Sequence, residues 1–444
     1  MNLIYDVEDR PSFGKVLLFA LQQLLAILAA TIAVPSVVGN GMSQSAALFG
    51  AGVGTITYLL FTKFKSPVFL GSSFAFIGSM SAAFGGAASM AMGYLGLIIG
   101  AAMAGLVYVI IAIAVKFAGV RWIDYLMPPV VIGPTVAIIG LSLAGNAVSD
   151  ALGGASNESG AYIMNTNGWV SLICAIVTLV VVCLCSVFGK KLMKLIPFII
   201  GICAGYILAV IFTLIGNASG NEALQIVDFS AFSNMQWVPD FTFLEAVKGF
   251  DELSGTYIAT VAVAYVPVAF VVFAEHLADH KNLSSVIGRE LLENPGLHRT
   301  LLGDGVGSFV GAIFGGCPNT TYGESVGCVA ITGNASVVTI FATAIMAIVA
   351  SFVGPFVTFL STIPSCVMGG VCITLYGFIA VSGLKMLQPV DLNDNRNLFT
   401  ASVIFIAGIG GMAIKIGDVE LTEIAVALIL GIIVNLILRN RDKK

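Results

Sequence analysis

Two short stretches, SPVFLGSSFAF (66–76) and GGCPNTTYGE (315–324), bring glycine, proline and small polar residues into the middle of long apolar runs. An α-helix cannot easily continue through either stretch, because glycine and proline are poor helix formers and proline lacks the backbone N–H. Two otherwise helical runs are therefore predicted to be broken. The structural consequence of these breaks depends on whether the apolar runs lie in the core of a soluble protein or in a lipid bilayer.

The composition places most of the chain in a lipid bilayer. Hydrophobic residues make up 58% of the 444 residues and charged residues only 10%, whereas a soluble globular domain carries roughly a quarter charged residues. The apolar content excludes a disordered chain, and 20 basic against 24 acidic residues exclude a nucleic-acid-binding protein. The sequence therefore predicts an all-α, multi-pass protein of the cell (plasma) membrane.

Apolar runs long enough to cross a bilayer, about 20 residues each, fall into two sets of seven. A more polar stretch at 217–252 separates the two sets. The fourteen predicted spans are 15–38, 44–62, 67–84, 92–118, 126–146, 168–189, 194–216, 253–281, 298–315, 317–333, 335–360, 364–384, 397–413 and 419–439.

The basic residues predict the orientation of these spans. With fourteen spans, all of the 20 Lys and Arg residues except Lys248 and Lys415 fall on one side of the membrane. Because basic residues gather on the cytoplasmic side, we expect both termini to be cytoplasmic. An error of one span would destroy this pattern, so the orientation and the count support each other.

The two sets of spans would have opposite orientations, and the sequence shows a faint repeat between them. MPPVVIG (127–133) recurs as IPSCVMG (363–369), and each opens the fifth span of its set. The two broken stretches lie in the third span of each set, and backbone that leaves the helical form at membrane depth must line a cavity or be buried in protein. Paired breaks in inverted halves indicate the binding site of a transporter, whereas one break alone would equally fit a Gly/Ser packing face.

Four carboxylates stand out within three of the predicted spans: Glu275, Asp279, Asp304 and Glu324. The only Lys and Arg residues in these three spans, Lys281 and Arg299, lie at span ends. Charges at membrane depth are costly and indicate function by default. Glu275 and Asp279 are one turn apart on one helix face, and Glu324 lies inside the second break, so we expect these to bind substrate or carry protons. For Asp304, a structural hydrogen bond is favoured over a functional role. For His276 and His280, a position at the membrane interface, at the cytoplasmic end of the span, is favoured.

The residue types around the breaks predict a small, planar, uncharged solute. Carboxylates accept hydrogen bonds from N–H groups, and the free backbone N–H groups of broken helices donate to carbonyl oxygens. Phe74, Phe76 and Tyr322 lie beside the breaks, where they could stack on a flat ring. No nucleophile–base pair, phosphate-binding loop or metal-ligand set stands out, so we expect neither an enzyme nor a cofactor or metal.

Several longer motifs resemble one known family over roughly residues 10–440. The chain resembles the nucleobase–ascorbate transporter family, also called nucleobase–cation symporter type two, and within it the bacterial uracil permease branch. The motifs that carry the resemblance are LQQLLAILAATIAVP (21–35), YLLFTKFKSPVFLGSSFAF (58–76), FAEHLADH (273–280), NPGLHRTLLGDG (294–305) and PNTTYGESVGCVAIT (318–332).

The resemblance implies an architecture. It implies fourteen spans in two inverted repeats, with short antiparallel strands breaking spans three and ten. A core domain would comprise residues 1–118 and 253–361, and a gate domain residues 119–252 and 362–444. The substrate would lie between the strands and span eight, transport would be coupled to protons, and the protein would form a homodimer.

The resemblance also implies roles for individual residues. Glu275 and Glu324 match the family's substrate-binding carboxylates, Phe74 and Gly323 match positions that contact the base, and Ala30 and Tyr376 match positions that line the pocket. With Tyr322 these are the predicted substrate-binding residues. The predicted proton-coupling residues are Glu275, Asp279, His280 and Asp304.

Three positions depart from the uracil permease pattern. Asp279 stands where that branch often has His, with His280 next to it. Ser325 stands where the family usually has Asn, and Asp304 stands where uracil permeases often have Asn and purine-type members an acidic residue. These departures leave the choice of nucleobase open.

The sequence therefore predicts a proton symporter that imports uracil by alternating access. The alternative within the family is a symporter for a purine of the xanthine type. A channel or an anion carrier on a related inverted-repeat fold is a third interpretation. An anion carrier should show a basic residue at the membrane midplane near the breaks, and none is visible there.

Overall fold

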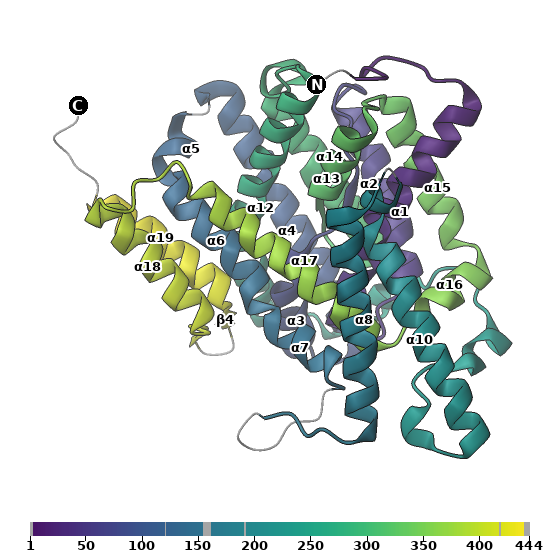
Figure 1. Cartoon of the computed structure of the whole chain (residues 1–444). Helices are drawn as coiled ribbons and strands as arrows, with labels where there is room; N and C mark the ends of the chain where they lie inside the picture. Colours follow the sequence, from purple (N-terminus) through teal and green to yellow (C-terminus); the bar gives the residue numbers. More distant parts are fainter. Residues whose placement is uncertain (1–2, 120, 154–160, 191, 417–418, 439–444) are drawn as a thin grey trace.

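The structure is a computed structural model that describes residues 3–119, 121–153, 161–190, 192–416 and 419–438. Helices dominate it (Figure 1). The elements of the first half are α1 (Phe13–Val38), α2 (Gln44–Phe61), β1 (Leu70–Ser72), the 3₁₀ turn η1 (Phe74–Phe76), α3 (Ile77–Gly85), α4 (Met90–Ala118), α5 (Arg121–Leu126), α6 (Pro129–Ser142), α7 (Ala144–Ala151), α8 (Thr166–Phe188), α9 (Leu192–Leu195) and α10 (Pro197–Ser219).

The predicted polar stretch 217–252 folds into short turns, and long helices resume after it. The remaining elements are η2 (Glu222–Leu224), η3 (Phe229–Asn234), α11 (Thr242–Ala246), η4 (Val247–Glu252), α12 (Gly255–Ile287), the π-helical turn η5 (Leu292–Gly296), α13 (Leu297–Gly315), β2 (Asn319–Thr321), α14 (Gly323–Thr332), α15 (Val337–Ser351), α16 (Gly354–Ser361), α17 (Ser365–Met386), α18 (Asn395–Ile409), β3 (Ile414–Ile416), β4 (Val419–Leu421) and α19 (Glu423–Leu438).

Several helices are long and apolar enough to cross a membrane, as a multi-pass membrane protein requires. Within the described residues eight helical segments qualify: α1, α2, α4, α6 with α7, α8, α10, α12 and α17. The bent pair α15 and α16 would make a ninth. The other predicted spans correspond to helices that are shorter, interrupted or, in α13, less apolar, so the count of fourteen stays a prediction.

Two predicted spans have a different form from the one expected. The span predicted at 335–360 is two helices that meet at 81°, because Pro355 follows Gly354 and neither favours an unbroken helix. The span predicted from residue 419 begins instead at Glu423, since residues 419–421 pair with 414–416 as a hairpin rich in β-branched residues. Its predicted end, residue 439, lies outside the described residues.

Local sequence signals set the ends of α12, the helix that carries most of the predicted site. The side chain of Ser254 accepts a hydrogen bond from the backbone N–H of Tyr257, which caps the first turn. The helix ends at Gly288, which adopts a left-handed conformation with φ of 68°. Between these ends 33 residues form a single helix, so residues four apart share a face along its whole length.

The two interrupted stretches meet each other in the middle of the protein. β1 and β2 pair antiparallel, with Gly71 opposite Thr320. The amide of Asn319 donates to the backbone oxygen of Gly50 at 3.1 Å and so attaches β2 to α2. After each strand the chain turns back into a helix, α3 in one case and α14 in the other, which leaves the first turn of α14 facing the space between the helix groups.

The helices pack in two groups (Figure 1). One contains η1 and the helices α1, α2, α3, α4, α12, α13, α14 and α15, and the other contains α6, α7, α8, α9, α10, α17, α18 and α19. In the first group α2 and α13 touch backbone to backbone, since a Cβ atom on Gly50 would lie 2.4 Å from the oxygen of Gly311. In the second, Pro128 and Pro364, which match in the repeated motif, each directly precede a helix, α6 and α17.

Candidate functional site

A cavity of about 350 Å³ lies between the two helix groups. From the first group it is lined by α12 and the start of α14, and from the second by α6, α10 and α17. A volume of this size is typical of pockets for small organic ligands. The cavity thus has one polar wall and one largely apolar wall, described in turn below.

Three carboxylates form the polar wall. Glu275 and Asp279 lie one turn apart on α12, and Glu324 lies in the first turn of α14 beside Gly323. The positive end of the α14 dipole favours a negative charge at Glu324. The described residues of the lining include no Lys, Arg or His. The wall can therefore accept hydrogen bonds from N–H groups and would repel an anion.

Residues on one face of α17 contribute much of the apolar wall. Leu375, Phe378, Ile379, Ser382 and Met386 follow one another at helical spacing and all line the cavity. The ring of Phe378 meets that of Phe198 from α10 edge-on, with centroids 5.9 Å apart. These two rings can cover a planar ligand.

Sequence reasoning missed both Phe198 and Phe378. The spacing of 375, 378, 379, 382 and 386 is a signal that could have identified the face of α17, but it gives no indication of what that face meets. Phe198 follows Pro197 at the start of α10, and no pattern in its own neighbourhood connects it with α17.

One hydrogen bond ties the carboxylate wall to the strands. The hydroxyl of Thr321, the last residue of β2, donates to Oδ2 of Asp279 at 2.9 Å. Because β2 pairs with β1, Asp279 is linked through Thr321 to both interrupted segments. A movement of the strands would therefore move the donor that holds Asp279.

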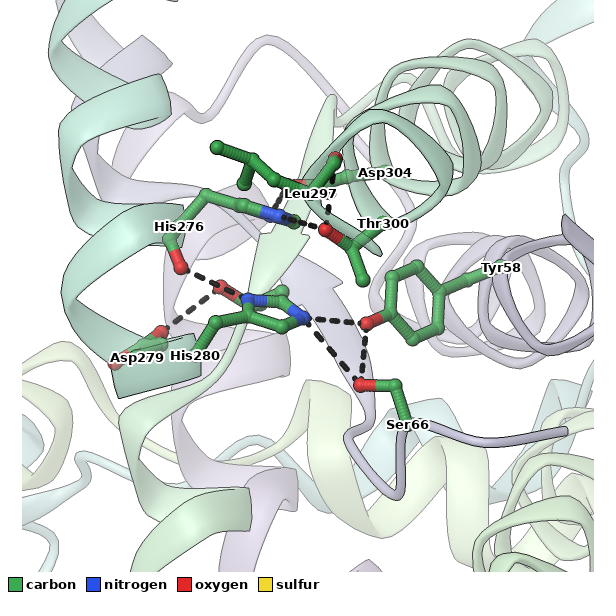
Figure 2. Close-up of polar contacts among 9 residues, drawn as sticks. Tyr58, Ser66, His276, Asp279, His280, Leu297, Thr300 and Asp304 are labelled. Atoms are coloured by element: carbon green, nitrogen blue, oxygen red, sulfur yellow. Dashed lines mark hydrogen bonds and ion pairs between the residues drawn. The ribbon is translucent and has the colours of Figure 1, made fainter. Parts of the chain in front are cut away.

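Two predicted residues, His280 and Asp304, lie behind this wall instead of in the cavity lining. Figure 2 shows the rings of His276 and His280 on the side of α12 that faces Thr300 and Tyr58. Nδ1 of His276 lies within hydrogen-bond distance of Oδ2 of Asp304, at 2.7 Å, and the ring of His276 stacks on that of His280 with centroids 4.0 Å apart. All three side chains are buried.

The contacts of this buried cluster join α12 to its neighbours. Nδ1 of His280 donates to the backbone oxygen of His276 at 2.8 Å, and Nε2 lies 2.6 Å from the hydroxyl of Tyr58 on α2 (Figure 2). The Tyr58 hydroxyl also donates to Ser66, and Nε2 of His276 lies 3.0 Å from the hydroxyl of Thr300 on α13. These contacts hold both rings inside the protein, and the interfacial position expected for the histidines stays a prediction.

The four other predicted substrate-binding residues lie close to the strands, outside the cavity lining. Tyr322 donates from its hydroxyl to the backbone oxygen of Ser72 at 2.8 Å and so fastens β1. The rings of Phe74 and Tyr376 meet edge-on with centroids 5.7 Å apart, one from each helix group. Ala30 is buried in α1.

Ser325, the departure from the expected Asn, joins three elements. Its oxygen lies 2.5 Å from the amide nitrogen of Gln23 on α1, which donates to it, and it also accepts from the backbone N–H of Phe69 at 3.0 Å. Ser325 and Gln23 are both buried. This side chain therefore supports the start of α14, where Glu324 lies.

Comparison with known proteins identifies the family of the chain. The model of a family described as the Permease family matches residues 14–417. The chain belongs to this family. This match and the similarity to curated uracil permeases together confirm the resemblance to the uracil permease branch of nucleobase–ascorbate transporters. The matched residues include all three carboxylates of the cavity and every helix of the two groups except α19.

Curated relatives of this family match over nearly the whole chain. The uracil permease of Bacillus caldolyticus is 41% identical and is covered over 96% of its length by 99% of this chain. The uracil permeases of Bacillus subtilis (strain 168) and Escherichia coli (strain K12) are 39% and 35% identical, with 97% and 98% of this chain covered and 94% and 93% of their own lengths.

Solved structures of other transporters share the fold of this permease. The transmembrane domain of the cyanobacterial bicarbonate transporter BicA superposes with a TM-score of 0.63 at 16% identity, covering 98% of this chain and 99% of that domain. Murine Solute Carrier 26 family member A9, an anion transporter in the inward-facing state, gives 0.65 at 13% identity, with coverage of 97% and 69%. At such identities the likeness concerns the fold alone.

Proposed function

We propose that this chain imports uracil across the cell membrane by proton symport. The observation that carries the proposal is the cavity lined by Glu275, Asp279 and Glu324 and by no basic side chain among the described residues. Uracil offers two N–H donors and two carbonyl acceptors on a flat ring. The relatives at 35–41% identity are uracil permeases, which supports the same substrate here.

In the proposed complex Glu275 and Glu324 accept the two N–H groups of uracil. The carbonyl oxygens accept from backbone N–H groups at the interrupted segments, beside Gly323. Phe198 and Phe378 cover the ring from the apolar wall. A bicarbonate-like anion would meet three carboxylates in this cavity. We therefore do not propose an anion as the substrate, although the fold is shared with anion transporters.

We assign the coupled proton to the pair Glu275 and Asp279. Asp279 lines the cavity and also accepts from Thr321, so it contacts both the substrate space and the strands. Asp304 and His280 do not face the substrate, and we give them the supporting role of holding α12 against α13 and α2. One charge moved across 100 mV supplies about 2.3 kcal/mol for accumulation.

The proposal includes the finer architecture. It comprises fourteen spans in two inverted repeats, a core domain (residues 1–118 and 253–361), a gate domain (residues 119–252 and 362–444), cytoplasmic termini and a homodimer. The two helix groups and the paired strands β1 and β2 support the division into core and gate. Alternating access would then be a movement of the first group against the second.

The experiment that tests this proposal is uptake of radiolabelled uracil into proteoliposomes with and without an inward proton gradient. We expect gradient-dependent uptake that excess unlabelled xanthine does not inhibit. Glu275→Gln and Glu324→Gln should each lower uracil affinity by about 10- to 100-fold, since each removes a charged hydrogen-bond partner. Asp279→Asn should keep uracil binding and lose the response to the gradient.

The control is Glu293→Gln, which changes an exposed glutamate outside the cavity and should behave like the unaltered protein. Gradient-driven accumulation in Glu275→Gln at the unaltered level would refute its role. Inhibition by low concentrations of xanthine would shift the proposal to a purine substrate.

A further inference from the structure

A second cavity, which none of the carboxylates described above lines, opens between three helix ends. It has a volume of about 370 Å³ and lies between the end of α2, the end of α4 and the start of α13. Its lining residues are Phe61, Ala112, Ile113, Lys116, Phe117, His298, Arg299 and Leu302. We propose that this groove binds the phosphate of an anionic phospholipid. The proposal does not rest on uracil transport.

The charges at the groove fit a phosphate. Lys116 and Arg299 come from different helices, and neither forms an ion pair with any side chain that the structure describes. Arg299 lies in the first turn of α13, whose N-cap residue is Gly296 and provides no capping side chain. A helix N-terminus without a side-chain cap favours an anion. The dipole of α13 therefore adds to the two cations, whereas the C-terminal ends of α2 and α4 at the groove act against them.

The apolar part of the groove fits acyl chains. Phe117 is 81% exposed and Ile113 is 51% exposed, which is costly unless hydrocarbon covers them. The same face of α4 continues away from the groove with Ile110 and Leu106, both more than half exposed. These four residues follow helical spacing, so a lipid whose phosphate lies at Lys116 can run its chains along them.

The position of the groove also fits a lipid. The helix ends that form it carry Lys116 and Arg299, and Lys63 follows the end of α2, which places the groove on the basic side of the membrane. Basic pockets between helices on the cytoplasmic side suit anionic head groups. A free phosphate ion would satisfy the cations but not the exposed stripe on α4.

The test measures lipid binding by the purified full-length chain. Native mass spectrometry reports retained lipid, and thermal unfolding in detergent reports stabilisation by added phosphatidylglycerol, phosphatidylcholine or inorganic phosphate. We expect selective retention of phosphatidylglycerol. Each basic residue near an anionic lipid contributes about 1 kcal/mol, and every 1.4 kcal/mol corresponds to about tenfold in affinity. The variant Lys116→Gln/Arg299→Gln should therefore bind phosphatidylglycerol about 30-fold more weakly.

Two matched variants complete the test. Lys194→Gln/Lys385→Gln removes the same charge from exposed positions away from the groove and should bind phosphatidylglycerol normally, and Lys116→Arg/Arg299→Lys should as well. Equal weakening by the Lys194→Gln/Lys385→Gln variant, or equal binding of phosphatidylcholine, would overturn the proposal. Protection by inorganic phosphate equal to that by phosphatidylglycerol would make the site one for free phosphate and would also overturn it.

Discussion

At the scale of single residues, the binding wall depends on side chains that never touch the cavity. Ser325 accepts hydrogen bonds from Gln23 and from the backbone of Phe69, and so connects α1, the stretch before β1 and the start of α14. Its neighbour Glu324 lines the cavity. The departure from the family pattern at Ser325 therefore changes how the start of α14 is held in place, and it does not directly change a contact with the substrate.

Ser325→Ala should destabilise the protein, because it leaves two buried donors without an acceptor. Each unsatisfied buried donor costs about 1–3 kcal/mol, so we expect a clear fall in the melting temperature measured in detergent. Ser402→Ala, on an exposed face of α18, is the control and should leave the melting temperature nearly unchanged. An unchanged melting temperature in Ser325→Ala would mean that water replaces the lost acceptor.

Among the residues of the site, the charged ones could be predicted from the sequence, whereas the aromatic ones could not. Glu275, Asp279 and Glu324 could be identified from the sequence because a charge in an apolar run is conspicuous. Asp304 was given a structural hydrogen bond as its favoured alternative, and it is bound to His276. Phe198 and Phe378 could not be found in this way, because an aromatic residue among apolar ones carries no signal until the fold brings two helices together.

At the scale of elements, the interrupted segments depend on close contact between α2 and α13. Gly50 and Gly311 let the two backbones touch, and the oxygen of Gly50 also accepts from Asn319 of β2. The strands are therefore anchored to a seam that has no room for a side chain. Close approach of this kind is what small residues provide at helix interfaces in membranes.

Gly50→Ala should lower stability although alanine is the better helix former. The added Cβ would lie 2.4 Å from the backbone oxygen of Gly311, and overpacking of this kind costs about 1–3 kcal/mol or more. Gly145→Ala on α7 is the matched control, since a Cβ there meets nothing within 4 Å. Thermal unfolding of both variants in detergent checks this, and an equal or higher melting temperature for Gly50→Ala would contradict it.

The sequence predicts the secondary-structure elements less completely than it predicts the charged residues of the site. The helix breaks at 66–76 and 315–324 were visible because glycine and proline gather there. The bend at Gly354 and Pro355 was missed because the apolar run continues on both sides of this pair. The pairing of Ile414–Ile416 with Val419–Leu421 was missed because the second of these strands directly precedes the apolar run of α19. Hydropathy indicates whether a segment lies in the membrane or in water. Whether the segment is a straight helix, a bent helix or a strand depends on the segments with which it packs.

At the scale of the whole molecule, one of the contacts between the two helix groups is a small apolar cluster. Ala26 of α1 and Cys328 of α14 pack there against Leu195 and Ile196, which lie at the end of α9 and just before α10. The cluster is separate from the main core of the protein. A small contact of this kind can open and close without disturbing the packing inside either group.

Alternating access requires this contact to separate during transport, and a covalent link across it should therefore stop the cycle. Cys328 is native, so the single change Ile196→Cys supplies the second thiol. After treatment with a short reducible thiol cross-linker, with the link verified by peptide mass spectrometry, uracil should still bind while uptake into proteoliposomes is lost. Reduction should restore uptake. Ile196→Cys/Cys328→Ser, treated identically, should transport throughout. Full uptake by a completely cross-linked protein would show that the two groups do not move apart at this contact.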